Sequence, residues 1–352
     1  MRGKRDLRVV LCGYYGFGNL GDELLLEALI DGLESCGVGR GEMAVLSGSP
    51  EETRARHGLV AADRWSVRGA AALLRRSETL LLGGGGIFQD ATSARSPVYY
   101  WGLVRIALLA GARPWCIGQS VGPFRRALSA RLARSSLAAC EVRGVRDARS
   151  ASLLKGWGLG CDVTCDPVMS LSVPAAGPST RDSAAGRLAV NIRPWRGDLP
   201  RRTAVEAVRT ASELSLELTG LALAAEDAAL MESLRDEGLF PATSIATLDA
   251  GGWRSDCSVL LSGATRVVAM RFHAAVLALL HGRDLVGVAY DPKVAELADE
   301  WGFPLWDGDG RMPRPGAPSA GLSAPSAGER FLRELRLMCD RALSPGEERV
   351  ND

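Results

Sequence analysis

The chain has 352 residues, 47% of them hydrophobic and 24% charged, and its formal net charge is +1. This composition is ordinary for a soluble globular protein, and the charge gives no reason to expect nucleic acid or a strongly charged membrane surface as the main partner. The length predicts two domains, each large enough to bury a core of its own.

Short aliphatic runs alternate with amphipathic helical stretches along the chain, which predicts parallel sheets covered by helices. In the first half we expect strands at 7–13, 43–48, 78–86, 114–123 and 141–145, and helices at 19–37, 97–111, 127–139 and 147–158. In the second half we expect strands at 187–195, 221–226, 265–273 and 284–293, and helices at 201–218, 274–282 and 294–302.

Two stretches of biased composition divide the chain. Residues 174–186 are rich in Pro, Gly, Ala and Ser and predict a linker, so we place one Rossmann-like domain at 1–175 and a second at 187–310. Residues 311–328 are of low complexity and are expected to form a mobile linker before an amphipathic helix at 329–345. The fold class is therefore α/β, with two Rossmann-like domains expected to face each other across a cleft.

A glycine-rich turn follows the first expected strand. Gly16, Gly18 and Gly21 match the G-x-G-x-x-G pattern of dinucleotide-binding turns. The second strand ends without the acidic residue that would hold a ribose, and Asp22 and Glu23 would repel a pyrophosphate at the start of the helix. A nicotinamide cofactor is therefore disfavoured, and a tight structural turn stays an alternative.

A second glycine cluster, LLLGGGGIFQD at 80–90, ends another expected strand. Consecutive glycines let backbone amides approach a ligand closely, so we place a binding site at Gly84 and Gly85. Gln89 and Asp90 follow them directly, and Gln119 lies at the exit of the next strand. Ligands of open parallel sheets bind at such strand exits.

Four cations and one histidine also lie at strand exits. Arg146 precedes an Asp that can cap the next helix or pair with it, and Arg193 precedes a proline. Arg271 and His273 lie two residues apart at the end of an apolar strand, where a helix begins and an anion would be stabilised. Lys293 begins a helix, where the dipole disfavours a cation, so we expect it to have an anionic partner.

The remaining histidines and the cysteines suggest no further site. His57 and His281 occur in unremarkable contexts and are expected to be exposed to solvent. The eight cysteines lack zinc-site spacing and are expected to be buried or incidental thiols in a reducing cytoplasm. No apolar run is long enough to span a bilayer, and the N-terminus reads as a first strand rather than a signal peptide. The expected localisation is cytoplasmic.

Taken together, the motifs GYYGFGNLGDE, LLLGGGGIFQDATSARS, IGQSVGP, VRD, DPVMSL, IRPW, MRFHA and YDPKV resemble the polysaccharide pyruvyl transferase family, most closely its CsaB-type branch. The resemblance covers roughly residues 7–305, with Phe272 where a leucine is expected. It implies a GT-B-like fold and phosphoenolpyruvate as donor. It also implies, as acceptor, a hexose such as N-acetylmannosamine on a lipid-linked cell-wall precursor. The product would be a 4,6-ketal, which anchors S-layer proteins.

The resemblance assigns the catalytic and anion-binding roles to Arg146, Arg271, His273 and Lys293. Phosphoenolpyruvate carries a phosphate and a carboxylate and needs several fixed cations, which agrees with these residue types. We expect His273 to act as general acid and base, and Asp22 or Asp90 to be a possible base. The expected substrate-binding residues are Asn19, Asp22, Gly84, Gly85, Gln89, Asp90, Gln119 and Arg193.

This chemistry requires neither a cofactor nor a metal, since phosphoenolpyruvate is a co-substrate. Two alternatives stay open: a glycosyltransferase that uses a nucleotide sugar, and a sugar-polymer-binding protein without activity. The arginines of the C-terminal helix suggest peripheral contact with the inner face of the membrane. The same helix can instead pack on the N-terminal domain, which we favour.

Overall fold

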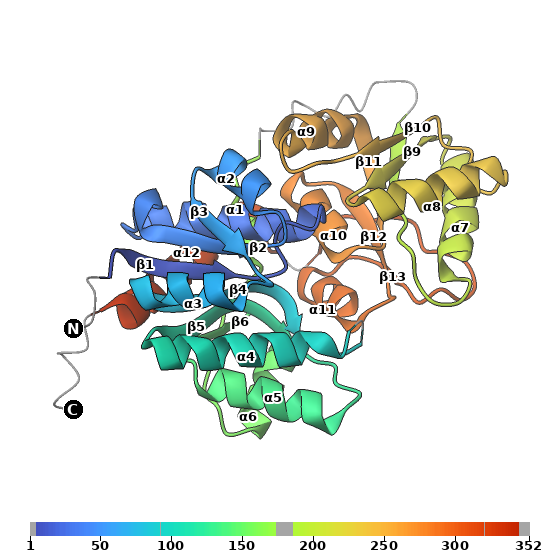
Figure 1. Cartoon of the computed structure of the whole chain (residues 1–352). Helices are drawn as coiled ribbons and strands as arrows, with labels where there is room; N and C mark the ends of the chain where they lie inside the picture. The colour runs from blue at the N-terminus through green and yellow to red at the C-terminus, as the bar shows by residue number, and fades with distance from the viewer. Residues whose placement is uncertain (1–4, 92, 174–185, 320, 345–352) are drawn as a thin grey trace. The chain divides into compact units, whose positions relative to one another are not determined.

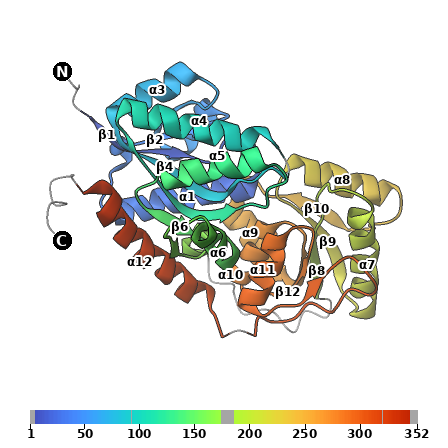
Figure 2. The same cartoon turned by 90° about the horizontal axis from the view of Figure 1, so that it is seen from below.

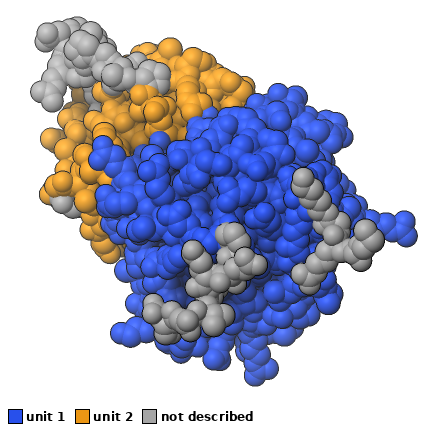
Figure 3. Space-filling view, turned by 90° about the vertical axis from the view of Figure 1, so that its left-hand side faces the viewer, with its two compact units in different colours: residues 1–17, 22–170, 328–352 blue, residues 18–21, 171–327 orange. Residues whose placement is uncertain are grey.

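The computed structural model describes residues 5–91, 93–173, 186–319 and 321–344. Its contacts divide the chain into two compact units, coloured separately in Figure 3. Unit 1 consists of residues 1–17, 22–170 and 328–352, and unit 2 of residues 18–21 and 171–327. A four-residue piece of the first glycine-rich turn thus belongs to the second unit, and most of the C-terminal helix belongs to the first.

Unit 1 contains a seven-stranded sheet in the order β3-β2-β1-β4-β5-β6-β7. Every neighbouring pair is parallel. Its strands are β1 (Leu7–Cys12), β2 (Met43–Ser47), β3 (Val60–Asp63), β4 (Ser77–Phe88), β5 (Arg113–Val121), β6 (Arg143–Val145) and β7 (Asp162–Val163). This is the Rossmann order, in which the chain reverses direction across the sheet between β1 and β4.

Helices cover both faces of this sheet (Figure 1). One core lies under α3 (Val67–Arg76), α4 (Arg95–Ala110), α5 (Ala127–Ala138) and α6 (Ala148–Gly156). The opposite face is covered by α1 (Leu20–Ser35) and α12 (Ala324–Leu343), and α2 (Pro50–His57) packs beside β2 and β3. A Cβ at Gly32 would lie 2.5 Å from a Leu335 methyl, so glycine allows α1 and α12 to approach closely. The C-terminal helix therefore packs on unit 1, the arrangement that we favour.

Unit 2 contains a six-stranded sheet in the order β10-β9-β8-β11-β12-β13, again with parallel neighbours. The strands are β8 (Arg187–Asn191), β9 (Glu217–Ala222), β10 (Ser244–Thr247), β11 (Ala264–Ala269), β12 (Asp284–Val288) and β13 (Leu305–Trp306). The helices are α7 (Leu199–Glu213), α8 (Ala225–Asp236), α9 (Trp253–Gly263), α10 (Phe272–Leu280) and α11 (Pro292–Trp301). This order repeats that of unit 1, with its reversal between β8 and β11.

The expected parallel α/β class is confirmed, but several elements differ from the sequence prediction. The strand expected at 78–86 continues through all four glycines to Phe88. The strand expected at 221–226 is displaced, because β9 ends at Ala222 and α8 begins at Ala225 with Glu226 and Asp227 in its first turn. Elements that we did not expect are α2, β3, α3, β7, α8, β10, α9, β13 and the short 3-10 helices at Arg40–Glu42 and Pro167–Ser170.

The two expected linkers have different outcomes. Residues 174–185 of the first lie outside the described residues. Part of the second is fixed on unit 2, because Gly316 forms an antiparallel bridge with Leu285 and the Met312 amide donates to Glu206.

All eight cysteines are free thiols, and six of them are buried. Within the described ranges, none of the helices has the length and apolarity needed to cross a membrane.

The expectation that His57 and His281 are exposed is wrong. His57 ends α2 and His281 follows α10, and both side chains are more than nine-tenths buried. Burial, with the nearby charges of Arg56 and Arg40, lowers the pKa of His57 to about 4. Burial and Arg283 lower the pKa of His281 to about 4 as well. The polar residues around each histidine in the sequence did not predict its burial, because both histidines lie at helix C-termini that pack against the core.

We expect these two histidines to make the protein acid-sensitive. Their folded-state pKa lies below the unfolded value of about 6.5, so the unfolded chain binds more protons as the pH falls from 6.5 towards 4. Stability is then fully present above pH 6.5 and is lost below it, by about 2 kcal/mol per histidine at pH 5. Urea unfolding between pH 7.5 and 5 measures this, and His281→Gln should make the dependence shallower. An unchanged slope in that variant would contradict the assignment.

Candidate active site

Polar side chains gather at the carboxyl ends of β8 and β11, where the strand order of unit 2 reverses. This is the place at which open parallel sheets bind their ligands. Asn191 ends β8, Arg193 follows it, and Arg271 and His273 lie at the junction of β11 and α10. The structure therefore places Arg193, Arg271 and His273 at the carboxyl ends of two adjacent strands.

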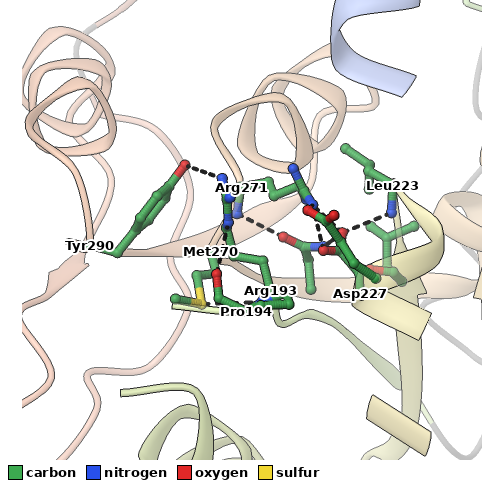
Figure 4. A network of polar contacts seen from close by, with 10 residues as sticks. Arg193, Pro194, Leu223, Asp227, Met270, Arg271 and Tyr290 are labelled. Atoms are coloured by element: carbon green, nitrogen blue, oxygen red, sulfur yellow. Dashed lines mark hydrogen bonds and ion pairs between the residues drawn. The ribbon is translucent and has the colours of Figure 1, made fainter. Parts of the chain in front are cut away.

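Arg271 is held in a buried network (Figure 4). Its Nε and Nη2 donate to the two carboxylate oxygens of Asp227 at 2.6 and 2.7 Å, and Nη2 also donates to Glu226 at 2.7 Å. The Arg271 amide donates to the side chain of Asn191 at 2.7 Å, and Asn191 donates to the Leu221 carbonyl at 2.8 Å. Burial opposes the charge, but pairing with Asp227 outweighs it, so the pKa of Arg271 is raised. This arginine joins the ends of β8, β9 and β11.

His273 packs against the glycine-rich turn. A Cβ on Gly21 would lie only 2.1 Å from His273 Nδ1 and 2.6 Å from its Cγ, so the turn backbone touches the imidazole. The Leu20 amide donates to the Leu223 carbonyl at 2.9 Å, which fixes this turn on unit 2. The Phe272 ring meets the imidazole edge-on at 5.2 Å. The third glycine of the G-x-G-x-x-G pattern thus makes room for a histidine.

Arg193 packs against a pair of contacting aromatic rings, Trp195 and Tyr290, and is partly exposed. Its guanidinium is 5.5 Å from the Trp195 ring centre and 5.2 Å from that of Tyr290, and Nη1 approaches the Tyr290 hydroxyl at 3.4 Å (Figure 4). None of the described carboxylates forms an ion pair with it. In contrast to Arg271, Arg193 keeps a positive charge that none of the described residues of unit 2 neutralises.

Lys293 lies near the ring of the same tyrosine, Tyr290. Its Nζ is 5.8 Å from the Tyr290 ring centre and 3.9 Å from Asp291 Oδ2. Asp291 also caps α11 by accepting from the Lys293 amide at 3.1 Å. The expected anionic partner of Lys293 is therefore present in its own turn, at a distance longer than a hydrogen bond. Tyr290 thus contacts two cations, one from each of two strand exits.

In unit 1 the corresponding reversal lies between β1 and β4, where the glycines are located. Gly84 and Gly85 have φ values of +67° and +81°, which residues with a side chain rarely adopt, and yet both lie within β4. Asp22 Oδ1 lies 3.6 Å from the position of a Cβ on Gly85, so its carboxylate borders the glycines. Gln119 is fully buried and donates to the carbonyls of Leu82 and Gly84. Gln119 thus stabilises the backbone conformation of β4 at its glycines.

Arg146 is buried in unit 1 and donates to Asp166 at 2.6 Å. Asp166 also accepts from the Val168 amide at 3.0 Å. Asp147 caps α6, as its position after Arg146 predicted, by accepting from the Ser150 amide at 2.7 Å. The sequence did not identify Asp166 as the partner, although it lies in the motif DPVMSL.

Asp90 and Gln89 serve the turns that follow β4. The two oxygens of Asp90 accept from the backbone amides of Arg125 and Arg126 at 2.6 and 2.9 Å. Burial would raise the pKa of this carboxyl, but these hydrogen bonds outweigh it and the pKa is lowered. Gln89 accepts from the Ala91 amide at 2.6 Å. Asn19 directly precedes α1 within the piece of the turn that belongs to unit 2.

An aromatic cluster in unit 1 was not predicted. Arg64 is buried, donates to the Gly13 carbonyl at 2.7 Å, and has the Tyr14, Phe17 and Trp65 rings within 5.6 Å. Tyr14 and Phe17 stack at 4.3 Å and both are exposed, as is Trp65. The aromatic residues of the turn GYYGF could have predicted this cluster, but the prediction for that turn used only its glycines and its polar residues.

Other members of the site were missed because they lie in elements that we did not expect. Asp227 and Glu226 open α8, directly after β9, which neighbours β8 in the sheet. A pair of acidic residues after a strand was the available signal. Among the described residues, no cluster of three or more His, Cys, Asp or Glu side chains is placed to hold a metal ion.

The model of one protein family, described as polysaccharide pyruvyl transferase, matches residues 19–292. Among solved structures, the chain is similar to Alr3699/HepE of Anabaena in complex with UDP and glucose, at 12% identity and a TM-score of 0.60 over 96% of this chain and 99% of that one. It is also similar to UDP-GlcNAc 2-epimerase from Methanocaldococcus jannaschii, at 9% identity and a TM-score of 0.61 over 94% of this chain and 99% of that one. A glycosyltransferase from Rickettsia africae is similar at 9% identity and a TM-score of 0.54 over 96% of this chain and 95% of that one. No curated protein matches. Identities this low show the shared GT-B-like fold alone.

Proposed function

The chain belongs to the polysaccharide pyruvyl transferase family, and on that basis we propose that it moves the pyruvyl group of phosphoenolpyruvate onto a hexose of a lipid-linked polysaccharide precursor. The reaction forms a ketal and releases phosphate. The observation that carries the proposal is that Arg193, His273 and Lys293 follow the three adjacent strands β8, β11 and β12 of unit 2. A small molecule with two anionic groups needs such a set of fixed cations beside a titratable group.

Arg193 and Lys293 are the residues that we assign to the anionic groups of the donor. Arg193 presents a guanidinium without a carboxylate partner, and its planar fork suits the two oxygens of a carboxylate or phosphate. Lys293 supplies a compact second charge, and Tyr290 contacts both. Because Arg193 packs against the contacting rings of Trp195 and Tyr290, the guanidinium is held in place before the ligand arrives.

His273 is assigned the proton transfers. One sugar hydroxyl adds to C2 of phosphoenolpyruvate while C3 takes a proton and becomes a methyl group. The bond between C2 and the phosphate oxygen then breaks, a second hydroxyl closes the ketal at C2, and its proton leaves with the phosphate. An imidazole has one nitrogen that can give the first proton and another that can accept the second.

Arg271 and Arg146 receive a positioning role in this proposal. Both guanidinium groups are buried and already paired with a carboxylate, Asp227 and Asp166 respectively. Arg271 lies two residues before His273, so its fork fixes the backbone from which the imidazole projects. This refines the expectation that both arginines contact the donor. Asp90 is likewise assigned to holding a turn rather than to acting as base, which leaves Asp22 as the candidate base.

The acceptor is assigned to unit 1. Asp22 beside Gly85 offers an acceptor for sugar hydroxyls, and the exposed rings of Tyr14 and Phe17 suit the apolar face of a pyranose. We propose N-acetylmannosamine of a secondary cell-wall polymer as the acceptor sugar, the CsaB-type specificity. The 4,6-ketal would then serve to anchor S-layer proteins.

We expect Arg193→Gln to raise the KM for phosphoenolpyruvate and to lower kcat/KM about 10- to 100-fold, because a charged hydrogen-bonding partner is lost. Thermal stability should change little, since the guanidinium is partly exposed and has no carboxylate partner among the described residues. Arg235→Gln, on an exposed arginine of the same unit, is the matched control and should behave as the wild type. Unchanged donor kinetics in Arg193→Gln would contradict the role of Arg193.

The test of the function is to mix the purified protein with phosphoenolpyruvate and a nitrophenyl-linked N-acetylmannosamine disaccharide, and to measure acceptor mass and free phosphate. A mass gain of one pyruvyl ketal with matching phosphate supports the proposal. The alternative that stays open is a nucleotide-sugar glycosyltransferase, because solved structures of that class share this fold. That alternative predicts instead a nucleoside diphosphate released from a UDP-sugar and no thermal protection by phosphoenolpyruvate.

A further inference from the structure

One segment of unit 1 has a strong charge imbalance. Residues 64–140 contain eleven arginines, no lysine and two acidic residues, Glu78 and Asp90, which gives 11 − 2 = +9 in a chain whose total is +1. Asp90 is buried and hydrogen-bonded to backbone amides, so it offsets little of this charge at the surface. The positive charge is therefore concentrated on one part of the molecule.

Many of these arginines lie on three helices that run side by side over one face of the unit 1 sheet, α3, α4 and α5 (Figures 1 and 2). Arg68 and Arg75 are exposed on α3, and Arg131 and Arg134 are exposed on α5. None of these four forms an ion pair with a carboxylate of the described residues. We call this surface the α3–α5 face.

The exposed residues of the middle helix, α4, are apolar except for Arg95 at its start. Leu109 on α4 is 90% exposed, and Val98 and Leu108 on the same helix are also exposed. Val67 at the start of α3 and Leu128 at the start of α5 are 67% and 62% exposed. Large exposed aliphatic groups flanked by arginines that lack acidic partners are unusual on a surface that meets only water.

We propose that the α3–α5 face binds the surface of an anionic lipid bilayer. Each basic residue near such a surface strengthens binding, and exposed aliphatic side chains enter the boundary between headgroups and acyl chains. Arginine suits this position because its stem lies along apolar groups while its charge reaches the phosphates. Charge complementarity thus identifies the partner as anionic lipid.

The C-terminal helix is a weaker candidate for this contact, although its arginines first suggested it. Arg330 donates to the Val163 carbonyl, Arg336 to the Ser35 carbonyl, and Arg341 pairs with Asp162. Three of its four arginines therefore hold the helix on unit 1. The acidic residues Glu329, Glu334 and Asp340 offset much of its remaining charge.

Sedimentation with vesicles of phosphatidylcholine alone, or with about one third phosphatidylglycerol, tests the proposal on the full chain. We expect binding only to the anionic vesicles, weakened by salt. The triple variant Arg75→Glu/Arg131→Glu/Arg134→Glu should bind more than about tenfold more weakly. Leu109→Ser/Leu128→Ser should lose the part of the binding that resists salt.

The matched control is Arg235→Glu/Arg314→Glu/Arg333→Glu, which changes net charge equally at three exposed arginines outside the face. It should bind anionic vesicles within about threefold of the wild type. Equal loss in both triple variants would mean that net charge alone governs binding and would overturn the proposal. So would wild-type binding by the first triple variant, or no binding by the wild-type chain. Thermal unfolding of each variant confirms that it is folded.

Discussion

Replacing Gly21 with alanine is expected to lower kcat about 100-fold or more while leaving the protein folded. The new methyl group would lie 2.1 Å from His273 Nδ1, which no pair of atoms tolerates, so the imidazole must move from its position. General acid–base catalysis by a positioned side chain contributes about 10²- to 10⁴-fold, and this contribution is what a displaced ring loses. Alanine is a better helix former than glycine, so α1 should not be weakened. Steady-state kinetics and thermal unfolding measure the two effects.

Two further variants show whether the effect acts through His273. His273→Ala should lower kcat at least as far as Gly21→Ala, and the double variant should be no slower than His273→Ala alone, because the ring that Gly21→Ala displaces is then absent. Gly41→Ala is the matched control, since a Cβ there meets no atom within 4 Å. A double variant much slower than His273→Ala, or a fully active Gly21→Ala, would contradict the contact or the role of His273.

The contact between Gly21 and His273 illustrates what the sequence could and could not predict. Local patterns predicted both residues as members of glycine-rich and strand-exit motifs, because each motif is set by a few neighbouring positions. Their contact depends on four residues of the first turn belonging to unit 2, which no local pattern encodes. The pattern alone therefore suggests that Gly21 serves a dinucleotide-like turn, whereas the structure places it beside the imidazole.

The same limit explains why the sequence did not predict the carboxylates that pair with the arginines. Arg271 was singled out by its place at the end of an apolar strand, but Asp227 is 44 residues earlier and meets it only because β9, β8 and β11 are adjacent. The net charge of the whole chain does not reveal the uneven distribution of charge along it, for a related reason. A value of +1 for the whole chain hides the +9 of residues 64–140, and only the placement of α3, α4 and α5 on one face makes that imbalance a surface property.

The ion pair between Arg271 and Asp227 leads to the second large effect that we expect. Asp227→Ala should lower the free energy of unfolding by about 3–5 kcal/mol, because it leaves a buried guanidinium without its main counter-charge. Asp227 is fully buried and supplies both oxygens of the fork, whereas the side chain of Glu226 is 59% exposed. Glu226→Ala should therefore cost less than about 1 kcal/mol. Urea or thermal unfolding of the two variants measures the difference.

The Asp227→Ala variant also distinguishes between the two roles that Arg271 could have. If its guanidinium positions the backbone before His273, Asp227→Ala should lower stability and kcat together and should leave the affinity for phosphoenolpyruvate nearly unchanged. If Arg271 itself bound the donor, removing the competing carboxylate would free the fork, and thermal protection by phosphoenolpyruvate would increase. Stronger protection with unchanged stability would therefore overturn the positioning role. The geometry favours the first outcome, because a fork that already holds both oxygens of Asp227 has its bidentate edge filled.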